Sequence, residues 1–201
     1  MVIAALLLAA AEPQSALEAE RAFAARAQAI GQWAAFREFA APDAVMFVPQ
    51  PVKAQDWLAQ QQEPRAAVQW WAAESYQSCD GRMAVNTGPW AIPSAKLVGY
   101  FTTVWRQGAA GWRWDYDGGT ALKAPIAAGD APRRVRAACR GRPAAPPFLS
   151  FPTSQSGKGT SADGTLAYQW HVRDAKGSRD FRAWLWNGKA WRLVLDQTIA
   201  E

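Results

Sequence analysis

Few residue types in this sequence are suited to catalysis or metal binding. The 201 residues include one histidine, His171, and two cysteines, Cys79 and Cys139. This set cannot build the standard zinc sites of four Cys or His ligands. A Ser-His-Asp or Cys-His arrangement could use only His171, which lies in a strand-like stretch where a structural role is the simpler interpretation. No glycine-rich phosphate-binding motif occurs either. With so few ligand residues and no such motif, we expect no metal and no cofactor.

An acid and several aromatic residues could instead line a pocket for a small molecule. Glu74 is the one acid in the apolar stretch WWAAESY, and the hydroxyl of Tyr100 would give such a pocket a polar group. Trp112, Trp114 and Tyr116 recur at every second residue and are expected on one face of a strand. The predicted ligand-binding residues are Trp33, Glu74, Tyr100, Trp114 and Tyr116.

Ordinary packing explains the same residues without a ligand. The aromatic side chains would then form the core between a sheet and helices, and Glu74 would point outward. Asp115 and Asp117 alternate with the tryptophans and are expected on the opposite face, as surface charges beside Arg113. A pocket with only apolar walls would favour binding, whereas a buried carboxylate beside a tyrosine hydroxyl would favour an enzyme.

Positive charge is concentrated in the last part of the chain. The net charge is +5, with −2 over residues 12–120 and +7 over residues 121–201. Five arginines gather in one segment: Arg133, Arg134, Arg136, Arg140 and Arg142. Such a cluster can bind phosphate groups, so an anionic lipid or an anionic envelope polymer is the predicted partner, and nucleic acid is not expected for an exported protein. A solvated linker is the alternative.

The first residues resemble an export signal. Residues 2–11 read VIAALLLAAA, and Ala9 and Ala11 form an A-x-A site that predicts cleavage before Glu12. This run is too short for a transmembrane helix, which needs about 20 residues. We therefore expect a periplasmic or secreted protein. In an oxidising compartment Cys79 and Cys139 are expected to form a disulfide, and two unrelated thiols are the alternative.

Hydrophobic periodicity predicts helices first and strands afterwards. Residues 15–18 form a capping box for a helix that runs to about Ile30, where Gly31 is a natural stop. Two shorter helices and a strand follow, and from about residue 66 the period changes to two. The predicted division of the chain is a signal peptide (1–11), a first domain (12–120), a Pro/Arg-rich linker (121–160) and a three-stranded antiparallel meander (161–201).

The C-terminal meander repeats part of the first domain. Residues 78–85 (SCDGRMAV) match residues 161–168 (SADGTLAY). A hairpin follows each match, and in each hairpin an aspartate stands five residues after a tryptophan, at Asp117 and at Asp196. We therefore expect 161–201 to repeat the strand unit of 78–117. Chance similarity between two tryptophan-rich hairpins is the alternative.

These features together carry a family resemblance. The order helix, helix, strand, short helix and long meander, with FREFAAPDAVMFVPQPV at 36–52 and the stretch TGPW at 87–90, resembles the nuclear transport factor 2-like superfamily and its SnoaL-like branch. The resemblance covers residues 14 to about 120. It implies an α+β cone, in which a curved mixed sheet packs on three helices around a pocket. Such domains often pair through the convex sheet face, which the added meander would cover, so a monomer is expected and a homodimer is the alternative.

The resemblance implies a shape more than a reaction. In ketosteroid isomerases of this shape an Asp base ends the first strand, and Val48 stands at that place here. We therefore expect a protein that is not an enzyme and that binds a small apolar or amphipathic molecule, or a partner protein. A small-molecule isomerase, cyclase or dehydratase that uses Glu74 and Tyr100 is one alternative. A purely structural envelope protein is the other.

Overall fold

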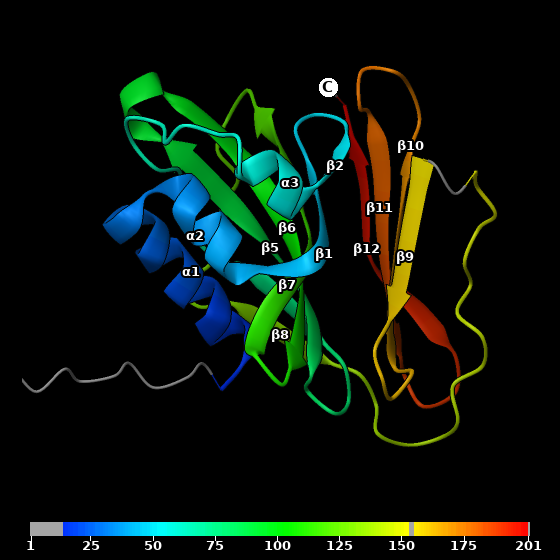
Figure 1. The fold of residues 1–201 in the computed structure, drawn as a ribbon. Helices are drawn as coiled ribbons and strands as arrows, with labels where there is room; N and C mark the ends of the chain where they lie inside the picture. Colours follow the sequence, from blue (N-terminus) through cyan, green and yellow to red (C-terminus); the bar gives the residue numbers. More distant parts are fainter. Residues whose placement is uncertain (1–13, 153–154, 201) are drawn as a thin grey trace, which may run out of the picture.

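The computed structural model describes residues 14–152 and 155–200. Three helices pack against one face of a curved mixed sheet, and a second, antiparallel sheet lies over the other face (Figure 1). The expected α+β fold class is confirmed. The predicted signal peptide, residues 1–11, lies outside the described residues. In the described part, no helix is long and apolar enough to cross a membrane.

Local signals set the bounds of the helices. The side chain of Ser15 caps the first helix by accepting a hydrogen bond from the backbone three residues later, and Gly31 ends it with a φ of +106°. The second helix begins at once, and the N–H groups of its second and third residues, Trp33 and Ala34, donate to the carboxylate of Glu63 at 2.9 and 2.7 Å. The helices are α1 (Ala16–Ile30), α2 (Gln32–Phe39) and α3 (Ala54–Leu58).

The first sheet contains eight strands in the order β2-β1-β7-β6-β5-β4-β8, with β3 paired to β5 beside this path. β1 is parallel to β7 and β4 is parallel to β8, whereas the other pairs are antiparallel. Its concave face and the helices share one apolar core, which is rich in aromatic rings. The strands are β1 (Ala40–Phe47), β2 (Pro51–Lys53), β3 (Gln69–Trp70), β4 (Glu74–Gln77), β5 (Met83–Ile92), β6 (Leu97–Gly108), β7 (Gly111–Leu122) and β8 (Arg133–Arg136).

The second sheet covers the convex face of the first. Its order is β12-β11-β10-β9, and all its pairs are antiparallel. A second apolar core joins the two sheets: Val104 and Tyr116 from the first meet Phe181 and Leu185 from the second. The strands are β9 (Ser156–Thr160), β10 (Leu166–Val172), β11 (Arg179–Trp186) and β12 (Trp191–Ile199).

The segment expected to be a linker contributes to both sheets. β8 adds an edge strand to the first sheet, and β9 makes the second sheet four-stranded, where the sequence indicated three strands. The predicted disulfide is confirmed, since Cys79 and Cys139 are bonded with their Cα atoms 5.1 Å apart. The bond fixes the end of β8 beside the β4–β5 turn.

The two repeated segments form the same turn. The hydroxyl of Ser78 donates to Asp80 at 2.6 Å, and the hydroxyl of Ser161 donates to Asp163 at 2.6 Å. The two turns also touch, because the backbone N–H of Asp80 donates to the carboxylate of Asp163 at 2.7 Å. The repeat in the sequence therefore corresponds to a repeat in the local structure.

Both repeated hairpins contain a β-bulge at the same place. In β7 the extra residue opposite β6 is Asp115, and in β12 the extra residue opposite β11 is Val194. Each stands three residues after the tryptophan of its hairpin, Trp112 or Trp191. A bulge turns every later side chain of its strand to the other face.

Candidate functional site

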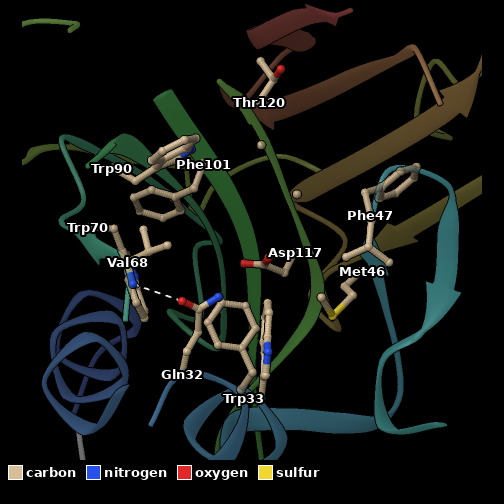
Figure 2. Close-up of a pocket in the computed structure, with 14 residues that line it drawn as sticks. Gln32, Trp33, Met46, Phe47, Val68, Trp70, Trp90, Phe101, Asp117 and Thr120 are labelled. Atoms are coloured by element: carbon tan, nitrogen blue, oxygen red, sulfur yellow. Dashed lines mark hydrogen bonds between the residues drawn. The ribbon is translucent and has the colours of Figure 1, made fainter. Parts of the chain in front are cut away.

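A cavity of about 230 Å³ lies between α2 and the concave face of the first sheet. Its wall is mostly apolar, and one carboxylate, that of Asp117, points into it (Figure 2). The other polar side chains of the wall are Gln32 and Thr120. Gln32 accepts a hydrogen bond from the backbone of Val68 at 3.0 Å and so joins α2 to the opposite wall. The aromatic lining residues are Trp33, Phe36, Phe47, Trp70, Trp90 and Phe101.

Asp117 is the one acid among the residues that line this cavity. It is partly exposed to the cavity, and its carboxylate accepts a hydrogen bond from the hydroxyl of Thr103 at 3.2 Å. The pKa of Asp117 is raised to about 7: burial is the largest cause and the nearby Glu20 adds to it, whereas the hydrogen bond from Thr103 and the positive charge of Arg179 act to lower the pKa. An acid with such a pKa can hold or release a proton at neutral pH.

A second buried acid, Glu20 on α1, stands behind the cavity wall. It is 1% exposed, and its carboxylate accepts hydrogen bonds from the indole N–H groups of Trp70 at 2.9 Å and Trp105 at 2.6 Å. The amide of Asn86 donates to it at 3.1 Å. Burial raises its pKa to about 7 although all three donors act to lower it. Glu20 therefore fixes the Trp70 side of the wall without lining the cavity.

The bulge at Asp115 explains why Asp117 lies in the cavity. The sequence suggested that Trp112, Trp114 and Tyr116 share one face and that Asp117 lies on the surface, and both expectations are wrong. Trp112 and Trp114 belong to the core under the helices, whereas Tyr116 belongs to the core between the sheets. The residue after Tyr116 therefore returns to the helix side, next to Thr103.

The structure separates the predicted ligand-binding residues. Trp33 lines the cavity. Trp114 and Tyr116 are both 0% exposed, so they pack the two cores and present no surface to a ligand. Tyr116 lies between Phe47 and Phe181, with ring centroids 5.5 and 4.8 Å away.

Glu74 and Tyr100 both line a different hollow, of about 630 Å³, between β4, β5 and β12. Glu74 forms an ion pair with Arg133 at 2.7 Å and accepts a hydrogen bond from the hydroxyl of Tyr76 at 2.5 Å. Partial burial acts to raise its pKa, but the hydrogen bonds and the charge of Arg133 lower it overall. A carboxylate held in its ionised form in this way is a poor proton donor.

The arginines of the predicted anion site lie in β8 and in the segment that follows it. Arg133 is paired with Glu74, and Arg136 donates to the backbone carbonyl of Cys79 at 2.9 Å. Arg134, Arg140 and Arg142 are exposed. The binding of an anion by this cluster stays a prediction.

The remaining candidate residue for chemistry, His171, does not line the cavity. His171 is on β10, where its ring stacks on Phe151 with centroids 3.8 Å apart. Over the described ranges, no three His, Cys, Asp or Glu side chains come together as a metal site.

Comparisons with known proteins give no family assignment. No family model matches the chain, and no curated protein matches it. Among solved structures, it is similar to a protein of the DUF3225 family from Pectobacterium atrosepticum (12% identity, 52% of this chain and 87% of that chain, TM-score 0.40). It is also similar to a ketosteroid isomerase candidate from Parabacteroides distasonis (15%, 55% and 90%, TM-score 0.43) and to a cystatin-like fold protein from Burkholderia xenovorans (12%, 53% and 84%, TM-score 0.37). These identities and TM-scores are too low to assign a function.

Proposed function

We propose that the protein binds a small, mostly apolar molecule in the cavity under α2, with one polar group of the molecule at Asp117. The observation that carries the proposal is an aromatic cavity of about 230 Å³ that contains a single acid. Binding sites for small molecules are usually mostly apolar hollows with a few polar groups that fix orientation. The cavity has that composition.

The volume limits the size of the ligand. An apolar cavity of about 150 Å³ accommodates benzene, and this cavity is larger at about 230 Å³. A single ring with a short polar substituent therefore fits, whereas the pockets that hold drug-sized ligands have volumes of roughly 300–1,000 Å³. The substituent would meet Asp117, because the rest of the wall offers mostly carbon.

Ligand-observed NMR with toluene, benzyl alcohol and benzylamine tests this proposal. The three probes share one ring and differ in the group that Asp117 would meet. We expect benzyl alcohol and benzylamine to bind more tightly than toluene, and benzylamine to gain affinity as the pH rises through 7 and Asp117 ionises.

Two variants show where the probes bind. Val68→Phe places a larger side chain in the cavity wall and should abolish binding. Leu193→Phe, at a residue of β12 that is 49% exposed and outside the cavity, should leave binding unchanged. If no probe binds, or if the two variants behave alike, the cavity is not a binding site of this kind.

A second candidate function rests on the pKa of Asp117. A base near neutrality can take a proton from a carbon next to a carbonyl and return it to another carbon, which needs no co-reactant. Incubation with cyclohex-3-enone, followed by the absorbance of the conjugated product, tests for this reaction. The rate should rise with pH through about 7 and be lost in Asp117→Asn. Without conversion above the buffer rate, this second function is rejected.

We also propose that the protein works outside a reducing compartment. The support is the Cys79–Cys139 bond, because stable disulfides persist mainly in exported proteins. Fractionation of the cells that produce the protein, with intact mass under non-reducing conditions, tests this. Finding the chain in the cytosol with both thiols free would contradict it.

A further inference from the structure

Arg179 is a buried cation that the second sheet inserts toward the cavity. It stands at the start of β11 and is 0% exposed. Arginine is rarely buried to this extent unless its charge has partners. Its Nη2 donates to the backbone carbonyl of Gly119 at 2.7 Å, and its guanidinium lies 4.3 Å from the centre of the Phe47 ring. Gly119 and Phe47 both line the cavity.

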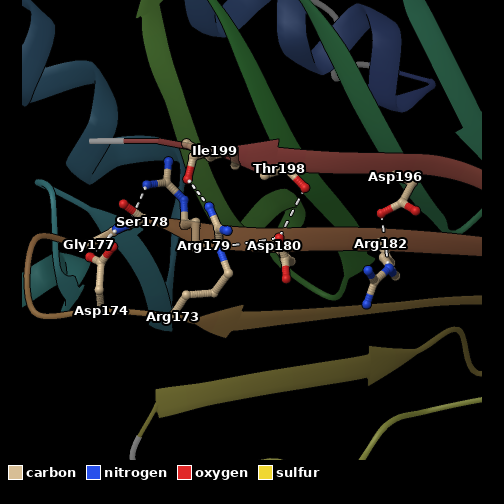
Figure 3. Close-up of polar contacts among 10 residues, drawn as sticks. All are labelled: Arg173, Asp174, Gly177, Ser178, Arg179, Asp180, Arg182, Asp196, Thr198 and Ile199. Carbon is tan, nitrogen blue, oxygen red and sulfur yellow. Dashed lines mark hydrogen bonds and ion pairs between the residues drawn. The ribbon is translucent and has the colours of Figure 1, made fainter.

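The loop before Arg179 packs against the β1–β2 connection, directly after Val48, which lines the cavity. Gly177 has a φ of +100°, and its Cα lies so close to Pro49 that a Cβ would come within 2.7 Å of the Pro49 carbonyl oxygen. The side chain of Gln50 donates to the carbonyl of Ala175 at 2.7 Å. The carboxylate of Asp174 stabilises the loop by accepting a hydrogen bond from the backbone N–H of Ser178 at 3.1 Å (Figure 3). The loop thus fixes the position of Arg179 against the β1–β2 connection.

Arg179 also affects the ionisation of Asp117. Two charged side chains of the described part act on Asp117, namely Glu20 from α1, which raises its pKa, and Arg179 from β11, which lowers it. The hydroxyl of Tyr116 and the guanidinium of Arg179 both lie close to Gly118. A Cβ added to Gly118 would be 2.8 Å from the hydroxyl and 3.1 Å from Nη2 of Arg179. Arg179 is thus the cation that favours the ionised form of Asp117.

We propose that Arg179 is a positioning residue of the cavity, so that the second sheet is part of the binding site as well as a cover for the convex face. Arg179 is not among the residues that line the cavity. It fixes the Gly119 carbonyl and the Phe47 ring in the wall, and its charge supports a negative charge at Asp117. This inference rests on the proposed function for its ligand and on the structure alone for its effect on Asp117.

Titration of Asp117 in the ligand-free protein tests the inference directly. Carboxyl carbon NMR at increasing pH should place its midpoint near 7 in the wild type. In Arg179→Met the midpoint should move up, because the cation is gone. A rise of one pH unit would reduce the ionised fraction at pH 7 about fivefold, and the affinity for benzylamine at pH 7 would fall by about the same factor.

Further variants separate the charge from the packing. Arg179→Gln removes the charge but keeps a polar amide at the buried position, so it should shift the midpoint as the Met variant does, and it serves if the Met variant does not fold. Arg179→Lys restores the charge and should bring the midpoint back toward the wild type. Arg173→Met is the matched control, because Arg173 pairs with Asp180 at 3.5 Å at the surface of the same sheet (Figure 3).

The outcomes are distinguishable from failure of the proposed function. An unchanged midpoint in folded Arg179→Gln overturns the inference, even if benzylamine binds. A raised midpoint supports the inference, even if none of the three probes binds. Equal shifts in Arg173→Met and Arg179→Met would also overturn it, because the midpoint would then respond to the loss of any positive charge from the second sheet.

Discussion

Replacing Asp117 by Asn is expected to change how stability depends on pH. Burial raises the pKa of Asp117 from 3.8 to about 7. Between these values the folded protein holds a proton that the unfolded chain has lost, so the free energy of unfolding falls as the pH rises through this window and is constant above it. An amide does not titrate and can still accept the hydrogen bond of Thr103. The variant should therefore lack the part of this loss that Asp117 contributes, whereas Glu20, whose pKa is also raised to about 7, contributes its own part in both proteins.

The magnitude follows from the width of the window. One pH unit of differential proton binding corresponds to about 1.4 kcal/mol. From pH 5 to pH 8 the protein crosses about two units of the window, so the wild type should lose about 3 kcal/mol that the Asp117→Asn variant keeps. This is the upper end of the expected range, because water that enters the cavity would stabilise the ionised form.

Urea unfolding of both proteins at pH 5 and pH 8, followed by tryptophan fluorescence, measures the effect. The quantity of interest is the difference between variant and wild type at pH 8 minus the same difference at pH 5. Asp196→Asn is the control, because Asp196 is the equivalent residue of the second repeat, with its side chain 46% exposed and paired with Arg182. If Asp117→Asn shows no larger pH dependence than this control, the carboxylate does not titrate near neutrality.

Three further predictions concern the framework of the site. The double variant Cys79→Ser, Cys139→Ser should lose about 3–4 kcal/mol of stability in urea unfolding, because the bond closes a loop over 60 residues; a loss below 1 kcal/mol would contradict this. Gly118→Ala should lower the melting temperature, at a cost of about 1–3 kcal/mol, since its Cβ would meet other atoms at 2.8 Å, whereas Gly108→Ala, with nothing within 4 Å, should not. Light scattering should give the mass of one chain at all concentrations, because the second sheet covers the convex face, and a stable dimer would disprove it.

Much of the fold could be predicted from the sequence because its signals are local. The capping residue Ser15 and the glycine at 31 bound α1 as expected. The change of period near residue 66 marks the point after which the described chain forms strands and no further α-helix. β8 was missed because its residues, Arg133 to Arg136, carry no alternating apolar pattern, and its pairing with β4 is a contact between distant segments.

The site was harder to predict because one residue changes its geometry. The alternation of Trp112, Trp114 and Tyr116 suggests a regular strand, and nothing in the stretch signals a bulge at Asp115. Once the bulge is present, Tyr116 faces the second sheet and Asp117 faces the cavity. The burial of Arg179 could not be predicted either, because its partners, a backbone carbonyl and an aromatic ring, are far away in the sequence.

The two copies of the strand unit show that the covering layer decides what a carboxylate can do. Asp117 and Asp196 each stand two residues after the bulge of their strand, on the face turned away from the core between the sheets. In the first copy helices cover that face, so the carboxylate of Asp117 lies in a cavity and its pKa is raised to about 7. In the second copy the described residues place no helix there, and Asp196 is exposed and pairs with Arg182 at 2.9 Å. The second copy acts on the cavity from the other side of the first sheet, through Arg179.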